Sequence, residues 1–419
     1  MTPRIRVLIF LIATQCAIVA VDVGEVGFGE RLVTELSPVL WAAAAIPLAI
    51  CIDWPNVWTS LNQTPALRLL VGLGAWAAII VALAPSPARS LAVTAAFAAT
   101  ACGVVDLARR SHDIGQFEDR FAMVVLASWA IFIGLSAVAW SIGGADLVRD
   151  SRLALVAHEA NHLARFGALA AVAALYVAFT RPEPFRRGAA ILLASSGLAV
   201  VLASDSRTAT VAVFLGGVVL VGRFGYSRAA VAAVGTALLG IGALVAAGLF
   251  GSLADGLRRT ADDPMANILA ANGRSEIWAP ILETAGDRRF LGYALGSDRQ
   301  LMLELYGTGR IDWPAEHAHS LILHLVLVLG LPGLLLLVGS VGSAAPHVIR
   351  STRLIASVLV VVMVGGVSEA AVSSPEVAWA AVTAAPASTL LVAVPSALSS
   401  YRLACAECSR PRDFAHEAT

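Results

Sequence analysis

Long apolar segments recur along the whole chain, and they constrain its fold more than any other feature. A helix needs about 20 apolar residues to cross the roughly 30 Å hydrocarbon core of a bilayer. Of the 419 residues, 58% are hydrophobic and 14% are charged, whereas about 25% of a soluble domain is charged. We therefore predict an all-α polytopic membrane protein of about twelve transmembrane helices. The predicted spans are 4–21, 37–52, 66–84, 89–106, 121–142, 163–180, 188–203, 208–222, 229–250, 318–342, 353–371 and 377–397.

The arginines predict how these spans are oriented. Every basic side chain is an arginine, and basic residues are enriched in cytoplasmic loops. With the N-terminus inside, the inner loops hold more arginines than the short outer loops, and the basic tail also lies inside. The first apolar segment lacks a small-residue cleavage site, so we interpret it as an uncleaved span. We expect a bacterial inner-membrane protein with both termini in the cytoplasm. The predicted inner-loop arginines are Arg109, Arg110, Arg120, Arg181, Arg186, Arg187, Arg223, Arg228, Arg350 and Arg353.

One segment stays out of the predicted membrane for much longer than any other loop. Gly251 to Glu316 carries seven arginines and ten acidic residues, and Arg274 to Ala285 can form a helix. This pattern indicates a folded periplasmic cap between the ninth and tenth spans. The predicted domains are an N-terminal bundle of about nine helices (1–250), the cap loop (251–317), the C-terminal membrane helices (318–399) and a disordered cytoplasmic tail (400–419).

Charge and cysteine content exclude other classes of protein. The formal net charge is zero, which argues against nucleic acid as a partner. Cys405 and Cys408 form a lone CxxC, and only His416 lies near them, whereas a structural zinc site needs four ligands. We therefore predict no metal site and no cofactor.

The first polar cluster is the turn from Ser204 to Thr208, between two apolar segments. Asp205 or Ser206 suits an ordinary helix cap. Arg207 is less ordinary, because an arginine at the membrane boundary is expensive and this side of the membrane is the one that basic residues avoid. We therefore expect a functional role for Arg207.

The second and third clusters lie in and after the long loop. Asn272 to Trp278 contains Arg274, which could simply pair with a nearby glutamate on a solvated surface, and it is followed by Leu291 to Ser297. His317 and His319 then lie where the chain re-enters the membrane. They could be ordinary residues of the membrane–water interface. A His-x-His pair is also a weak indication of a metal site. Imidazole is in addition a suitable group for proton transfer near neutral pH.

Taken in order, these motifs resemble the O-antigen ligase family and its relatives, the O-antigen polymerases and protein O-oligosaccharyltransferases. The resemblance rests on Ser-Arg-Thr, Gly-Arg-x-x-x-Trp, Gly-Tyr-x-x-Gly, His-Ala-His-Ser and the later Leu-Gly-Leu-Pro-Gly, and covers roughly Leu193 to Val341. Two positions depart from the family pattern: Ala294 interrupts a Gly-Tyr-Gly-x-Gly form, and Ser320 replaces a frequent asparagine.

The resemblance implies a metal-independent glycosyltransferase at the periplasmic face. It would move a glycan from undecaprenyl diphosphate to the lipid A–core of lipopolysaccharide or to another glycan acceptor. By motif position, Arg207 and Arg274 would hold the diphosphate and His319 would act on the acceptor hydroxyl. We assign substrate contacts to His317, Ser206, Trp278 and Tyr293.

Other readings stay open. A polymerase or a protein-glycosylating enzyme would use the same kind of donor. A lipid or polysaccharide transporter is disfavoured because many transporters consist of two related halves, and the second half of this sequence does not resemble the first. Polar or aromatic residues in or near apolar segments are further candidates for the site. The plainer interpretation is that they belong to solvated helix ends or to interfacial aromatic belts. These residues are His158, Glu159, His162, Arg165, His324, Glu369, Trp54 and Trp313.

Overall fold

The computed structural model describes residues 1–20, 30–61, 65–141, 148–149, 152–153, 160–181, 183–204, 206–225, 274–311 and 320–368. These residues are helical apart from turns and one antiparallel pair of two-residue strands, β1 and β2. The predicted spans 229–250 and 377–397 lie outside the described residues. The elements are α1 (Pro3–Ala20), α2 (Glu30–Cys51), α3 (Trp54–Leu61), α4 (Pro65–Ile80), η2 (Val81–Leu83), α5 (Pro87–Arg109), α6 (Ile114–Ser141), β1 (Val148–Arg149), β2 (Arg152–Leu153), α7 (Ala160–Thr180), α8 (Pro184–Ala203), α9 (Arg207–Arg223), α12 (Arg274–Asp287), α13 (Asp298–Gly307), α14 (Leu321–Ser351) and α15 (Leu354–Ser368).

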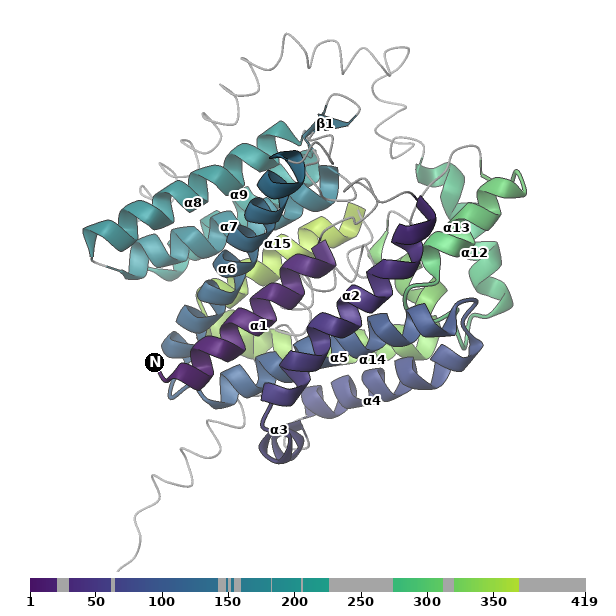
Figure 1. The fold of residues 1–419 in the computed structure, drawn as a ribbon, viewed down its shortest axis with the longest axis horizontal. Coiled ribbons are helices and arrows are strands. Elements are labelled where there is room, and N and C mark those ends of the chain that lie inside the picture. The colour runs from purple at the N-terminus through teal and green to yellow at the C-terminus, as the bar shows by residue number, and fades with distance from the viewer. Residues whose placement is uncertain are drawn as a thin grey trace, which may run out of the picture.

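The helices pack into a bundle with a continuous apolar core, and its closest helix contacts are made by small residues. A Cβ built at Gly167 of α7 would lie 2.7 Å from the carbonyl oxygen of Gly197 in α8. Small side chains let helix backbones approach closely, which is how helices pack where lipid provides no hydrophobic drive. Figure 1 shows β1 on the side of the bundle opposite the N-terminus and α3.

Membrane-spanning character is confirmed for part of the predicted set. Within the described residues, five helices are long and apolar enough to cross a membrane. The second predicted span, 37–52, corresponds to the first helix of a bent pair, Leu40–Cys51 and Trp54–Leu61, which turns by 92°. Leu67–Leu83 and Thr208–Arg223 are shorter apolar helices. The chain is therefore a helical membrane protein, and the count of twelve spans stays a prediction.

Several predicted inner-loop arginines meet at one set of helix ends. Arg109 at the end of α5 pairs with Asp53 at 2.7 Å, and Arg181 after α7 pairs with Asp119 at 2.6 Å. The Arg353 guanidinium lies 4.7 Å from the centre of the Phe224 ring, just beyond α9. These contacts join the start of α3 to α5, α6 to the end of α7, and the end of α9 to the start of α15.

A second, smaller apolar cluster joins the long predicted loop to α14. Ile277 and Ile281 of α12, Met302 of α13 and Leu327 of α14 are its buried centre. Figure 1 shows α12 and α13 at the edge of the bundle. The helix predicted at Arg274 to Ala285 is thus confirmed as α12, and it packs on the first half of α14.

Candidate functional site

The two arginines predicted to bind diphosphate occupy equivalent positions on two helices. Arg207 is the first residue of α9, and Arg274 is the first residue of α12 within the described part of the chain. The conformations of these two side chains lie outside the described residues. His317 and His319 also lie outside them, and α14 begins two residues after His319, at Leu321.

Ser206 acts as the N-cap of α9. Its hydroxyl accepts a hydrogen bond from the Ala209 amide at 3.4 Å, and the side chain is buried. This confirms the plainer interpretation of the Ser204 to Thr208 turn, in which a serine caps the helix.

The charge at the start of α9 is unusual for a helix. Arg207 stands at the positive end of the helix macrodipole, and the first turn contains no acidic residue. A cation at this end is unfavourable by about 0.3–1 kcal/mol, whereas a phosphate is favoured there. The helix end would therefore favour a bound anion at this position.

The glycine-rich loop after α12 inserts into a break in α14. Within α14, Gly330 has φ of 65° and ψ of −177°, so the helix is interrupted there. Tyr293 donates its amide hydrogen to the Leu327 carbonyl at 3.0 Å, and Ala294 donates to the Val328 carbonyl at 2.8 Å. Two motifs that are 38 residues apart at Gly292 and Gly330 therefore form one hydrogen-bonded joint.

The local sequence explains why the break occurs where it does. Pro332 has no amide hydrogen and cannot donate to the Val328 carbonyl four residues earlier, as a continuous helix would require. The amide of Ala294 satisfies that carbonyl instead. Leu331 in turn donates to the Arg289 carbonyl at 2.8 Å. The loop thus replaces the hydrogen bonds that the break removes.

Ala294 adopts the backbone conformation that the family's glycine would favour. Its φ is 75°, and its side chain is fully buried. A left-handed conformation costs a residue with a Cβ about 1–2 kcal/mol. An alanine at this position therefore adopts a conformation that suits glycine, at some cost in backbone strain.

Two predicted substrate contacts contribute to the packing of α12. Trp278 and Tyr293 both pack against the smaller apolar cluster. The Tyr293 hydroxyl donates to the Thr284 carbonyl at 3.3 Å, and the Arg288 guanidinium lies 4.9 Å from the centre of its ring. Burial raises the pKa of Tyr293, although Arg288 acts in the opposite direction. Both side chains are only half-buried, so each retains an accessible surface.

Buried polar residues lie close to the joint in the sequence. His324 on α14 is fully buried, as are Ser297 and Asp298 at the start of α13. His324 was a candidate from the sequence because it is polar within an apolar segment. Ser297 and Asp298 were missed, since polar residues in a polar loop give no signal of burial.

The remaining sequence candidates are dispersed. Arg165 is buried on α7, and the half-exposed Trp54 donates its indole N–H to the Ala49 carbonyl at 2.8 Å. The side chain of His162 lies outside the described residues, and so do His158, Glu159, Trp313 and Glu369.

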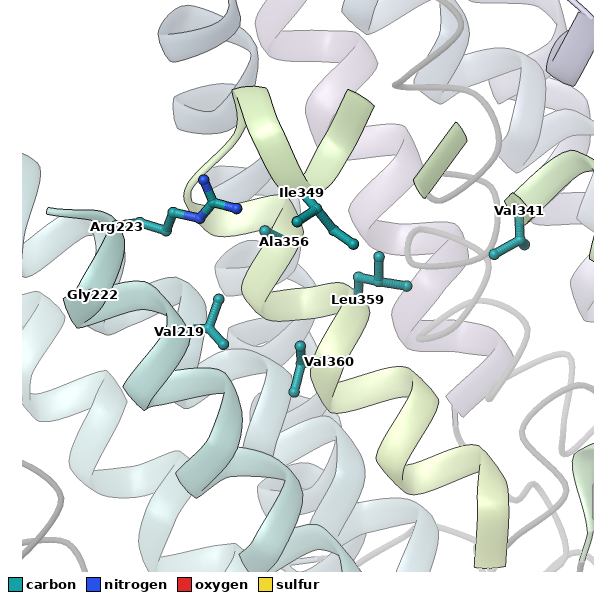
Figure 2. Close-up of a pocket in the computed structure, with 8 residues that line it drawn as sticks. All are labelled: Val219, Gly222, Arg223, Val341, Ile349, Ala356, Leu359 and Val360. Atoms are coloured by element: carbon teal, nitrogen blue, oxygen red, sulfur yellow. The ribbon is translucent and has the colours of Figure 1, made fainter. Parts of the chain in front are cut away.

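An apolar pocket of about 750 Å³ lies between α9, α14 and α15. Figure 2 shows Val219 of α9 and Val360 of α15 on facing helices, with Arg223 at the edge. Arg223 ends α9, so the pocket is about 24 Å along the helix from Arg207 at 1.5 Å per residue. It is therefore separate from the candidate site. Its lining residues are Val219, Gly222, Arg223, Val341, Ile349, Ala356, Leu359 and Val360.

The described residues around the joint include no cluster of metal-ligating side chains. No group of three or more His, Cys, Asp or Glu side chains within the described ranges could hold a metal ion. His317 and His319 lie outside that search, so independence from metals stays a prediction.

Comparison with known proteins identifies one family over the region that carries these motifs. Residues 188–338 match the family model for O-antigen ligase. This range includes α8, α9, α12, α13 and the break in α14. The comparison with curated proteins gave no match, and neither did the comparison with solved structures.

Proposed function

Residues 188–338 carry the O-antigen ligase family region, and from this premise we propose that the chain is an O-antigen ligase. The match supports a membrane glycosyltransferase of the O-antigen ligase/polymerase type, with a lipid-linked glycan donor and a glycan acceptor. In our proposal the donor glycan is linked to undecaprenyl diphosphate and the acceptor is the lipid A–core of lipopolysaccharide. The reaction takes place at the periplasmic face of the inner membrane, within twelve spans and under the cap at 251–317.

The joint between Gly292 and Gly330 is the observation that carries this proposal. It ties the loop that follows α12, the Arg274 helix, to α14, the helix that follows His319. A transfer reaction needs its leaving-group site and its acceptor site in a fixed relation. The joint supplies a rigid connection between the two segments that the motifs assign to those sites.

The arginines suit the leaving group. As the bond between the anomeric carbon and the phosphate oxygen breaks, the departing undecaprenyl diphosphate gains negative charge. Arg207 stands at the N-terminus of α9, where the backbone amides and the macrodipole also favour an anion. Fixed positive groups at such a position stabilise the transition state, and Arg274 supplies a second guanidinium.

The acceptor reaction needs only a proton acceptor. The acceptor hydroxyl oxygen attacks the anomeric carbon, and an imidazole nitrogen of His319 receives the hydroxyl proton. His317, Trp278 and Tyr293 contact the sugars, and no metal takes part. The combination of two arginines and a histidine favours a ligase over an O-antigen polymerase or a protein O-oligosaccharyltransferase, which would use the same donor.

A transfer assay with purified protein tests the proposal. It would contain undecaprenyl diphosphate-linked glycan, lipid A–core and a metal chelator, with Arg207→Ala as the test variant. Arg186→Ala is the matched control, because Arg186 lies on α8 with an exposed side chain. We expect glycan on the lipid A–core, a loss of at least about 100-fold in Arg207→Ala and no change in Arg186→Ala.

The other outcomes are equally specific. A carrier-linked glycan that grows longer would identify a polymerase, and glycan on an added acceptor protein would identify a protein-glycosylating enzyme. A transfer reaction that requires added metal would contradict the metal-independent mechanism. Absence of every transfer, with folded protein, would favour a transporter.

A further inference from the structure

Trp76 of α4 contacts the joint from outside the family region. Its indole N–H donates to the Leu329 carbonyl at 2.7 Å, across 253 residues of sequence. In a continuous helix that carbonyl would accept from Gly333, but the break at Gly330 interrupts the pattern. The indole therefore donates a hydrogen bond to a backbone carbonyl directly beside the break.

A second link connects the same part of the N-terminal bundle to the loop. Arg288 donates to the Leu83 carbonyl of η2, the short helix that extends α4, at 3.0 Å. The α4–η2 segment thus contacts both partners of the joint: Trp76 contacts the broken helix, and Leu83 contacts the loop that fills the break.

From these contacts we propose that Trp76 is a positioning residue for the transfer reaction, an inference that rests on the proposed function. The first half of α14 runs from Leu321 to Leu329, a length of about 12 Å at 1.5 Å per residue. A tilt of about 10° at the break would therefore move the start of the helix by about 2 Å. A misplacement of about 1 Å can lower a rate about 100-fold.

The direction of the tilt is controlled by hydrogen bonds from two sources. The loop bonds to the Leu327 and Val328 carbonyls, and Trp76 bonds to the next carbonyl along the chain, that of Leu329. The loop moves with α12, whereas Trp76 belongs to the membrane bundle. Trp76 thus fixes the acceptor-side segment of α14 relative to the bundle that contains Arg207.

The test compares two tryptophans that each donate an indole N–H hydrogen bond to a neighbouring helix. Trp76→Phe replaces the indole with a phenyl ring, so the side chain stays aromatic but loses the N–H donor. Trp129→Phe is the matched control, because Trp129 donates its indole N–H to the Ser196 hydroxyl at 3.1 Å, between α6 and α8. Transfer kinetics would be measured for both variants, together with hydrogen–deuterium exchange of the backbone amides at 289–295 and 329–333.

We expect Trp76→Phe to lower kcat at least 10-fold, with the KM for the lipid-linked donor changed less than twofold, and to accelerate exchange in both peptides. Trp129→Phe should leave kcat and that exchange unchanged. The proposal fails if Trp76→Phe keeps its kcat, or if both variants lose activity equally. If the wild-type protein transfers no glycan, the proposed function fails instead. Hydrogen exchange then decides whether Trp76 holds the joint, and unchanged exchange in Trp76→Phe would overturn that role.

Discussion

Gly292 and Gly330 pack against each other so closely that neither position has space for a side chain. A Cβ built at Gly292 would lie 2.6 Å from the Gly330 amide nitrogen, and one built at Gly330 would lie 2.7 Å from the Phe290 carbonyl oxygen. Both glycines have a positive φ, 71° and 65°. The joint therefore depends on glycine for both conformation and space.

Alanine at either glycine should open the joint. We expect Gly330→Ala and Gly292→Ala each to destabilise the protein by about 1–3 kcal/mol from backbone strain, with a further loss from the steric clash. Gly342→Ala is the control, because a Cβ there meets nothing within 4 Å and alanine is the better helix former. Thermal unfolding in detergent measures all three, and equal stability of Gly330→Ala and Gly342→Ala would contradict the close packing.

Ala294 should tolerate glycine and reject larger residues. Ala294→Gly relieves about 1–2 kcal/mol of left-handed strain and loses about 0.8 kcal/mol of methyl burial, so we expect a change within about 1 kcal/mol. Ala294→Val should be strongly destabilising, since a β-branched residue is a genuine outlier at positive φ and the site is fully buried. The melting temperatures of the two variants should differ clearly, and a tolerated valine would show that the loop can move away.

Glu118 should stabilise the start of α15. Its carboxylate accepts from the amides of Arg353 at 2.7 Å and Ile355 at 3.2 Å. Removing the carboxyl group leaves both amide donors without this acceptor, and an unsatisfied buried donor costs about 1–3 kcal/mol, so Glu118→Ala should lower the free energy of unfolding by at least about 2 kcal/mol. Glu183→Ala is the control, because its exposed ion pair with Arg186 at 3.6 Å contributes little. Similar unfolding curves for the two variants would disprove the capping role.

The raised pKa of Tyr293 predicts that the stability of the protein depends on pH in the alkaline range. Because burial raises its pKa in the folded state, the neutral phenol is favoured by folding. Its stabilising contribution is present below the unfolded pKa of about 10 and is lost as the pH rises through the raised value. The phenolate absorbance of the native protein should therefore appear at a higher pH than in the unfolded chain, and the difference should decrease by the contribution of one tyrosine in Tyr293→Phe.

Arg207→Lys separates charge from geometry at the proposed diphosphate site. Lysine keeps the charge but loses the planar, bidentate guanidinium. If the arginine grips the diphosphate, kcat should fall about 10- to 100-fold, less than in Arg207→Ala. Transfer kinetics at saturating donor measure this, and a lysine variant with wild-type kcat would reduce the role of Arg207 to its charge alone.

Membrane character and the family could be predicted from the sequence because each depends on local information. Apolar segments of sufficient length are visible in any window of the chain, and ten of the twelve predicted spans overlap described helices. The cap of α9 by Ser206 and the helix at Arg274 to Ala285 also follow from neighbouring residues. The order of short motifs indicated a resemblance to the O-antigen ligase family, and residues 188–338 match the model of that family.

The tertiary structure decided how those motifs meet. The sequence places Gly292 and Gly330 in two separate motifs, but only the folded chain shows that the loop at one fills the helix break at the other. Nothing in the sequence indicated a role for Trp76, because its hydrogen-bond partner is a backbone carbonyl 253 residues away. Hydrogen bonds between distant segments depend on where the backbone is placed in space, and no local pattern of side chains encodes that placement.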